Sequence, residues 1–274
     1  MLLKSITALS AILAVLECLG GNFLLLPLCF AGNFLGLMLL AFLFLVVVSY
    51  QVDQDKEQEK DDPFYRWVIA VYVEVLIQLL QARVTATGLE KTPKDGRFLL
   101  VCNHQFLADP GILLHYFRDS QLAFISKQEN RNMFCVGPLM HKILCQTLDR
   151  DNDRQALKVI LKCIQIIKED KASIAVFPEG GTNHDDKLYP LKPGVFKIAQ
   201  KAGVPIVVCT LNGTRGIVKN GLRLKPTDVT LHLVDVIPAE ELKGKTTVEI
   251  ADRVYDMMLD DLGEEYAAET KQNT

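Results

Sequence analysis

Residues 97–117 read RFLLVCNHQFLADPGILLHYF, and this stretch contains the repeating unit from which the fold is built. Its first part, Arg97 to Cys102, is a short aliphatic and aromatic run typical of a buried strand. Its last part, Pro110 to Phe117, predicts a helix, because proline is favoured at the first helical position. His104 therefore falls on the turn between a strand and a helix.

The same alternation continues along the chain. Residues 153–168 place apolar side chains on one helical face, and residues 193–202 predict a helix that ends at Gly203. Four further strand-like runs are bounded by turn residues: QLAFIS (121–126), SIAVFP (173–178), VPIVVCTL (204–211) and VTLHLVDV (229–236). Strands that alternate with helices over residues 84–265 predict an α/β domain with a mostly parallel, mixed sheet flanked by helices and with its chemistry at the strand ends.

The first fifty residues are of a different kind. Glu17 is the only charged residue between positions 6 and 30, and residues 34–50 carry no charge. A membrane-spanning helix needs about 20 apolar residues, so these stretches predict two spans joined by a tight turn near Gly32 and Asn33. One span preceded by a helix in the membrane interface is the alternative, because polar residues and a proline interrupt the first stretch. A cleaved signal peptide would have a shorter apolar region.

Three shorter segments complete the predicted organisation. Residues 51–63 mix acidic and basic side chains and are predicted to form a charged linker. Residues 64–83 set Trp and Tyr among aliphatic side chains, which is typical of a helix in the membrane interface, although a helix docked on the domain is equally consistent. The tail, residues 266–274, is predicted to be flexible.

Composition excludes several classes of function. The chain has 274 residues, 49% of them hydrophobic, and a formal net charge of −3, which argues against a nucleic-acid partner. Its seven cysteines form no C-x-x-C pair and the histidines show no ligand spacing, so we predict a reduced, cytosolic domain without a metal. No phosphate-binding glycine pattern of a nucleotide site follows any predicted strand.

His104 and Asp109 are the candidate catalytic residues. A neutral imidazole can remove a proton from a hydroxyl, and a carboxylate on its other nitrogen fixes the tautomer and stabilises the imidazolium. Asp109 could instead cap the helix that starts with Pro110, since Asp is a favoured N-cap residue. The two roles do not exclude each other.

Two other stretches carry candidate binding residues. A predicted strand is followed by Glu179, Gly180, Gly181 and Thr182. Glycines after a strand let backbone N–H groups approach an anion. The same residues could instead form an ordinary turn without a binding role. Arg150 lies just before the 153–168 helix and could hold a phosphate there, or belong to a solvated loop of Asp–Arg pairs. Lys127, which follows another strand, could likewise hold a phosphate or belong to a solvated loop.

Taken together, these stretches resemble the glycerolipid acyltransferase family, which includes the 1-acyl-sn-glycerol-3-phosphate acyltransferases. The family motif N-H-x-x-x-x-D is complete here, and F-P-E-G is present at residues 177–180. Members commonly continue F-P-E-G with Thr-Arg, whereas this chain has Gly181 and Thr182, and Leu144 stands where the Arg150 motif usually opens with Gly. The resemblance covers roughly residues 80–220. Its remaining matches are Arg150, Lys127 with Glu129, and Pro205 in VPIV.

The resemblance implies a reaction. His104, oriented by Asp109, would deprotonate a lysophospholipid hydroxyl, which attacks an acyl thioester of coenzyme A or acyl carrier protein without a cofactor, a metal or a covalent enzyme intermediate. Arg150 and Lys127 would hold the acceptor's phosphate, and Glu179, Gly180, Gly181 and Thr182 would shape its site. The residues with a structural role in the motifs would be Asn103, Phe177, Pro178 and Pro205.

By the same resemblance, the acceptor is lysophosphatidic acid and the product is phosphatidic acid for phospholipid synthesis. The partners would be membrane lipids and the acyl donor, with acyl carrier protein as one candidate, and the active domain would lie on the cytoplasmic face of the membrane. Two alternatives remain open. One is transfer to another lysophospholipid, and the other is an inactive membrane scaffold.

Overall fold

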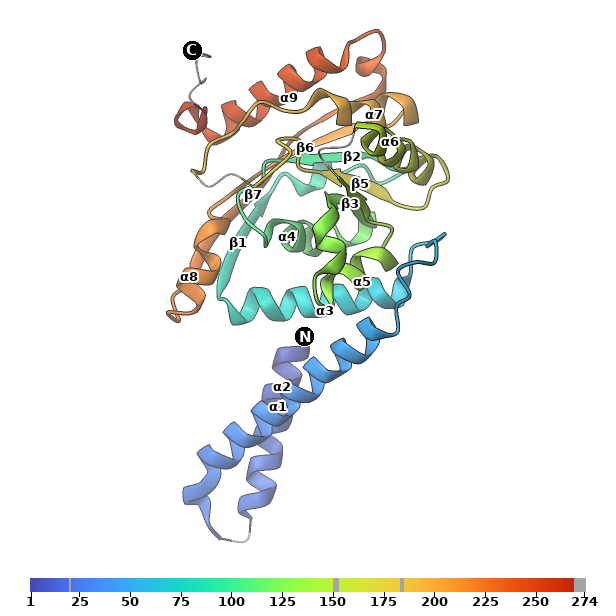
Figure 1. Ribbon diagram of the computed structural model, residues 1–274. Helices are drawn as coiled ribbons and strands as arrows, with labels where there is room; N and C mark the ends of the chain where they lie inside the picture. The colour runs from blue at the N-terminus through green and yellow to red at the C-terminus, as the bar shows by residue number, and fades with distance from the viewer. Residues whose placement is uncertain (20, 150–152, 183–184, 269–274) are drawn as a thin grey trace.

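A computed structural model describes residues 1–19, 21–149, 153–182 and 185–268, and shows an α/β domain from which a helical hairpin extends (Figure 1). The sheet has seven strands in the order β1-β7-β6-β2-β5-β3-β4. All neighbours are parallel except β6 and β7, which confirms the predicted mixed, mostly parallel sheet. The strands are β1 (Ala82–Thr87), β2 (Leu99–Cys102), β3 (Leu122–Lys127), β4 (Gln146–Leu148), β5 (Ser173–Val176), β6 (Ile206–Asn212) and β7 (Thr227–Ile237).

The two strands that the apolar runs do not predict, β1 and β4, are the two edges of the sheet. β1 alternates between half-buried and exposed residues, and β4 is three residues long and half-buried. An edge strand has one partner and is often short, so its sequence lacks the continuous apolar run of a central strand. The helix predicted over residues 64–83 is too long at its C-terminal end, because β1 begins at Ala82.

Helices cover both faces of the sheet (Figure 1). On one face lie α6 (Asp153–Lys168), α7 (Lys197–Ala202) and α9 (Thr247–Leu262), and on the other lie α3 (Pro63–Leu79), α4 (Asp109–Tyr116) and α5 (Val136–Lys142), with α8 (Ile217–Gly221) beside β7. All four residues of β2 are fully buried, with Leu99 and Val101 in the core under α6 and α9 and Leu100 and Cys102 in the core under α4. The central strand is therefore packed from both sides.

The predicted helix at 193–202 starts as a 3-10 turn, and only 197–202 is α-helical.

The N-terminal hairpin consists of α1 (Leu2–Cys18) and α2 (Leu26–Tyr50). The turn lies before a short 3-10 segment at Phe23–Leu25, so the turn predicted near Gly32 and Asn33 is wrong. α2 continues through both residues, and the Asn33 side chain donates to Glu17 across the hairpin at 3.2 Å. Among the described residues one helix, Phe23–Tyr50, is long and apolar enough to cross a membrane.

Residues 51–62, within the predicted charged linker, contact the α/β domain. Arg131 donates to the Gln54 carbonyl at 3.0 Å and to Asp55, His141 contacts the Lys56 carbonyl, and Lys162 pairs with Glu57. Basic side chains of the domain thus form ion pairs with Asp55 and Glu57 of this segment. The sequence alone could not predict which residues pair.

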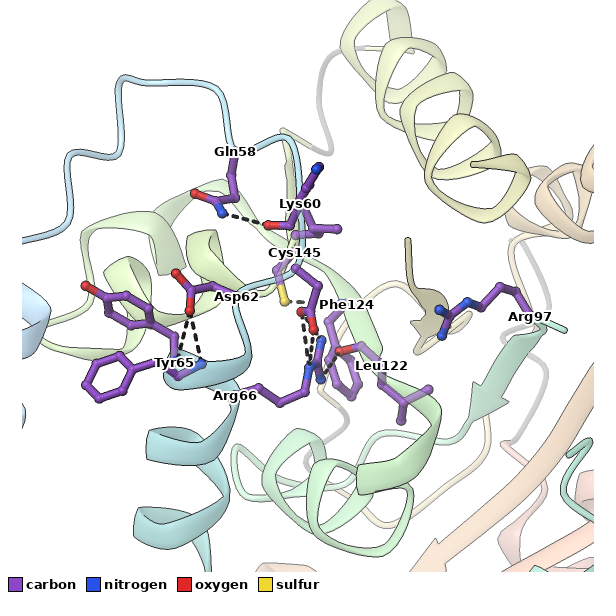
Figure 2. A network of polar contacts seen from close by, with 12 residues as sticks. Gln58, Lys60, Asp62, Tyr65, Arg66, Arg97, Leu122, Phe124 and Cys145 are labelled. Atoms are coloured by element: carbon purple, nitrogen blue, oxygen red, sulfur yellow. Dashed lines mark hydrogen bonds and ion pairs between the residues drawn. The ribbon is translucent and has the colours of Figure 1, made fainter. Parts of the chain in front are cut away.

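The start of α3 is anchored by a network of polar contacts (Figure 2). Asp62 caps the helix by accepting from the amides of Phe64 and Tyr65. Arg66 forms a salt bridge with Asp61 in which the side chains are only 14% and 7% exposed, and it also donates to the Leu122 carbonyl of β3 at 3.1 Å. This network ties the end of the charged segment and the first turn of α3 to the sheet.

The first residues of the segment predicted to be a flexible tail contact the α/β domain. The amide of Leu188 donates to the Tyr266 carbonyl at 2.7 Å, and the amide of Ala268 donates to the Leu188 carbonyl at 3.2 Å. The Tyr266 hydroxyl also accepts from Asn212 at the end of β6. Tertiary contacts therefore hold residues 266–268, and the rest of the predicted tail lies outside the described residues.

Candidate active site

The turn between β2 and α4 brings His104 and Asp109 into direct contact. His104 Nδ1 lies 2.8 Å from Asp109 Oδ2, and the Asp109 side chain is fully buried whereas that of His104 is 14% exposed. A carboxylate only accepts hydrogen bonds, so in the neutral imidazole Nδ1 carries the proton and Nε2 keeps a lone pair. The pair therefore presents an oriented base at the surface.

Asp109 does not cap the helix it begins, so the N-cap interpretation is wrong. Ala108 occupies the cap position, and no side-chain bond caps α4. Asp109 Oδ2 instead accepts from the backbone amides of Gln105 and Phe106, each at 2.8 Å, in the preceding turn. These bonds fix the carboxylate against His104 before any substrate arrives.

The F-P-E-G segment supports His104 from the neighbouring strand. The Phe177 ring, just after β5, stacks on the His104 imidazole with centroids 4.1 Å apart, and Phe124 of β3 stacks on Phe177 in turn at 5.9 Å. Glu179 Oε1 accepts from the backbone amide of His104 at 2.8 Å, while Oε2 accepts from the amide of Tyr189 at 3.1 Å. Glu179 is buried and thus positions the His104 turn and the 185–192 segment.

Asn103 and Pro205 sit where β2 meets β6. The Asn103 side chain donates to the Leu211 carbonyl at 2.8 Å and accepts from the Leu211 amide at 2.7 Å, which prolongs the pairing of the two strands with side-chain bonds. Pro205 precedes the first residue of β6, and its carbonyl accepts from the Leu99 amide. Asn103 thus holds the end of β2 next to His104 in register with β6, and Pro205 contacts the opposite end of β2.

Gly180 has a φ of +80°, which favours glycine, and its missing side chain leaves room for Lys192. A Cβ at Gly180 would lie 2.3 Å from Lys192 Cε, so the lysine stem crosses directly over this glycine. Lys192 is exposed and makes no ion pair with a described residue. The motifs did not include Lys192, because it lies twelve positions beyond Gly180. Its backbone amide contacts the motif by donating to the Pro178 carbonyl at 2.8 Å.

Lys127 ends β3 at the same edge of the sheet as the turn that carries His104. Leu100 of β2 is level with Ala175 and Phe124 in the register, so Lys127 is level with Asn103, two strands or about 10 Å away. It pairs with Glu129 at 2.8 Å, and both side chains are at least half exposed. Gly181 and Thr182 follow Gly180 in the loop, half-buried and exposed respectively. Arg150 lies outside the described residues.

The cysteine beside the dyad is not a nucleophile. Cys102 is completely buried at the end of β2, and burial raises the pKa of its thiol well above the ordinary value. A buried, protonated thiol is inert.

Within the described ranges, no group of three or more His, Cys, Asp or Glu side chains is arranged to hold a metal ion. His104 therefore remains the one oriented base described at this turn, and a metal-free reaction remains a prediction.

Comparison with known proteins shows what this chain is similar to. A model of the acyltransferase family matches residues 83–212. A 1-acyl-sn-glycerol-3-phosphate acyltransferase of Chlamydomonas reinhardtii is 33% identical over 159 residues, which are 57% of this chain and 47% of that protein. A probable 1-acyl-sn-glycerol-3-phosphate acyltransferase of Mycoplasma pneumoniae is 32% identical over 161 residues, 57% of this chain and 59% of that protein. The chain thus spans about half the length of these curated relatives.

A solved structure has the same architecture. The crystal structure of the 1-acyl-sn-glycerophosphate (LPA) acyltransferase PlsC from Thermotoga maritima superposes with a TM-score of 0.63 at 25% sequence identity, covering 83% of this chain and 89% of that one. The family match includes β2, the His104–Asp109 turn and the F-P-E-G segment. Residues 83–212 of this chain therefore match the acyltransferase family model, as the motifs indicated.

Proposed function

We propose that the protein transfers a fatty acyl group from an acyl thioester to the free hydroxyl of 1-acyl-sn-glycerol-3-phosphate, giving phosphatidic acid. The observation that carries this proposal is the 2.8 Å contact between His104 and the buried Asp109 at a turn supported by Phe177 and Glu179. A base held in one tautomer, with its second nitrogen free, is what deprotonation of an alcohol requires. The names of the relatives supply the acceptor.

In the proposed reaction, His104 Nε2 takes the hydroxyl proton while the oxygen attacks the thioester carbonyl. Asp109 stabilises the imidazolium that forms, and backbone N–H groups of the motif loops stabilise the negative oxygen of the tetrahedral intermediate. Collapse breaks the carbon–sulfur bond, and the imidazolium returns its proton to the departing thiolate. No covalent acyl-enzyme is formed and no cofactor is needed, whether the thiol belongs to coenzyme A or to acyl carrier protein.

The acceptor's phosphate needs cations close to the dyad. Lys127 and Arg150, assigned by resemblance, are two of them. Lys192 is a third, because it crosses Gly180 beside the residue that holds the His104 amide. Lys192 thereby offers a positive charge near the position where relatives carry Arg after F-P-E-G and this chain carries Gly181-Thr182.

The apolar hairpin gives the reaction its location. Most large side chains of α2 are exposed, as expected for a helix that contacts lipid rather than protein. We propose that the hairpin is embedded in the membrane, by two spans or by one span and an interfacial helix. α3 would then lie at the bilayer surface, with the active domain on the cytoplasmic side. This arrangement brings the dyad to an acceptor that resides in the bilayer.

The activity is tested by acyl transfer with the full chain reconstituted in vesicles. We expect turnover of 1-acyl-sn-glycerol-3-phosphate to exceed that of lysophospholipids with choline or ethanolamine headgroups, because only the first presents a terminal phosphate to the cations. Measured rates on this panel decide between the two candidate acceptors. Equal rates on all headgroups would contradict the phosphate-holding roles, and absence of transfer to every acceptor would contradict the activity.

Lys192→Gln is expected to raise the KM for 1-acyl-sn-glycerol-3-phosphate about tenfold with little change in kcat, because a charge-assisted hydrogen bond to phosphate is lost while the dyad is intact. The matched control is Lys201→Gln, which removes an exposed lysine of α7 and should leave both constants unchanged. A KM that is unchanged in Lys192→Gln would remove Lys192 from the acceptor site.

A further inference from the structure

The end of α8 and the loop after it expose apolar side chains in an unusual way. Leu222 and Leu224 are each 79% exposed, and no other large apolar side chain described between residues 63 and 268 is as exposed. Val218, one turn earlier, is 39% exposed. We refer to residues 218–225 as the α8 loop. Exposed leucines that are clustered rather than scattered mark an interaction site.

Basic side chains alternate with these leucines. Lys219, Arg223 and Lys225 are all exposed, and none of them makes an ion pair with another described residue. Residues 213–227 contain no Asp or Glu, although the whole chain carries a net charge of −3. The α8 loop is therefore a local positive and apolar cluster on an acidic protein, which favours an anionic and apolar partner.

The leucines are held outward by a rigid base. The Lys225 amide donates to the Asn220 carbonyl at 2.9 Å, and the Asn220 side chain donates to Thr227 at 3.0 Å. Gly221 packs against Leu80, where a Cβ would approach the Leu80 side chain to 2.9 Å. The exposure of Leu222 and Leu224 is thus built into the fold.

The position of the α8 loop identifies the partner. Leu80 directly follows α3, whose last turn exposes Leu76 and Leu79, at 55% and 42%. Figure 1 shows α8 reaching the level of α3, on the side of the domain from which the α1–α2 hairpin extends. The α8 loop thus adjoins, through the contact of Gly221 with Leu80, the segment proposed to lie on the membrane. Lys and Arg beside leucines are the composition of segments that insert into the headgroup region of anionic bilayers.

We propose that the α8 loop is a second membrane contact, which inserts Leu222 and Leu224 into a bilayer and binds its anionic headgroups through Lys219, Arg223 and Lys225. The proposal rests on the membrane placement of the proposed function. The hairpin and the α8 loop would hold the domain at two points, so that the domain cannot swing freely about α2. The dyad would then keep a constant height above the lipid surface.

The test uses single-tryptophan variants of the full chain, because Trp67 is the only tryptophan. In a Trp67→Phe background, Leu222→Trp is reconstituted in vesicles that contain phosphatidylglycerol and a phospholipid brominated on its acyl chain. We expect the bromines to quench about half or more of its fluorescence, since an inserted side chain lies about 5–10 Å below the headgroups. The matched control is Val248→Trp on α9, which is 53% exposed but lies across the sheet from α3, and which should not be quenched.

A charge variant completes the test. Replacing Lys219, Arg223 and Lys225 by Gln in the Leu222→Trp protein should weaken insertion of the indole by about fivefold for each charge removed, and vesicles of phosphatidylcholine alone should weaken it similarly. Quenching in Leu222→Trp no stronger than in Val248→Trp, or quenching insensitive to both changes, overturns the proposal. A blue shift that grows with protein concentration without quenching would assign the surface to a second copy and also overturn it. Fluorescence does not depend on turnover, so the result stands apart from the enzymatic assay.

Discussion

His104→Ala is expected to lower the rate of acyl transfer by about a thousandfold, the middle of the range for loss of a general base. In the proposed reaction the imidazole receives the hydroxyl proton, and the described part of the turn offers no other base that could replace it. The variant should remain folded, because His104 is partly exposed and the Asp109 carboxylate keeps two backbone donors after the ring is removed. The measurement is single-turnover acyl transfer, with thermal unfolding of the same preparation.

A second histidine provides a matched control. His232 of β7 contacts Asp261 of α9 at 2.6 Å, so it has the same type of carboxylate partner. It lies on the opposite face of the sheet, because its neighbours Leu231 and Leu233 point into the core under α4. We expect His232→Ala to retain activity within about twofold, as there is no transition-state contact to lose. Equal losses in the two variants, or a His104→Ala enzyme with near-normal turnover, would show that the dyad is not the catalytic base.

Arg66→Met is expected to destabilise the protein by about 3–5 kcal/mol. The substitution removes the partner of Asp61 in a pair that is largely shielded from water, and it also removes the donor to the Leu122 carbonyl. An unpaired, buried carboxylate is costly because water no longer solvates it. In thermal unfolding of the full chain we expect the midpoint to fall by about 6–12 °C.

Two further variants separate the buried charge from other effects of this change. Arg253→Met breaks an exposed pair with Glu241, in which the side chains are 47% and 48% exposed, and should cost less than about 1 kcal/mol. The double variant Asp61→Leu/Arg66→Met removes both charges and should recover much of the loss, because no unpaired carboxylate remains. If the double variant is as unstable as Arg66→Met alone, the penalty arises from lost packing or from the Leu122 contact rather than from an unpaired charge.

Most central elements could be predicted because their sequence patterns are local. The runs around Leu99–Cys102, Ser173–Val176 and Ile206–Asn212 are apolar because these strands are buried on both faces. Gly203, at φ +71°, ends α7 as its position suggested. β1 and β4 escaped prediction because edge strands are only half covered. α9 was also missed, although Thr246 and Glu249 form a capping box at its start.

The position of the N-terminal turn could not be read from composition. Gly32 and Asn33 are frequent turn residues, yet they lie within α2, where Asn33 finds a partner on α1. Pro27 was the better indicator of where α2 begins, because proline is tolerated in the first turn of a helix. The contacts of the charged segment 51–62 with the domain could not be predicted either, since its basic partners on α5 and α6 lie about a hundred residues away in the chain.

By itself, the sequence determined the alternation of strands and helices, the apolar character of the N-terminal hairpin, and the presence of His104 and Asp109 on one strand-to-helix turn. These properties depend on residue types and on spacings of a few positions, which short-range physical chemistry controls. Only the tertiary structure decided that Asp109 turns back to His104 instead of capping α4, that Phe177 stacks on the imidazole, and that Lys192 crosses Gly180. Each of these contacts joins side chains whose directions are set by the packing of separate segments, and packing of that kind leaves no local pattern in a sequence.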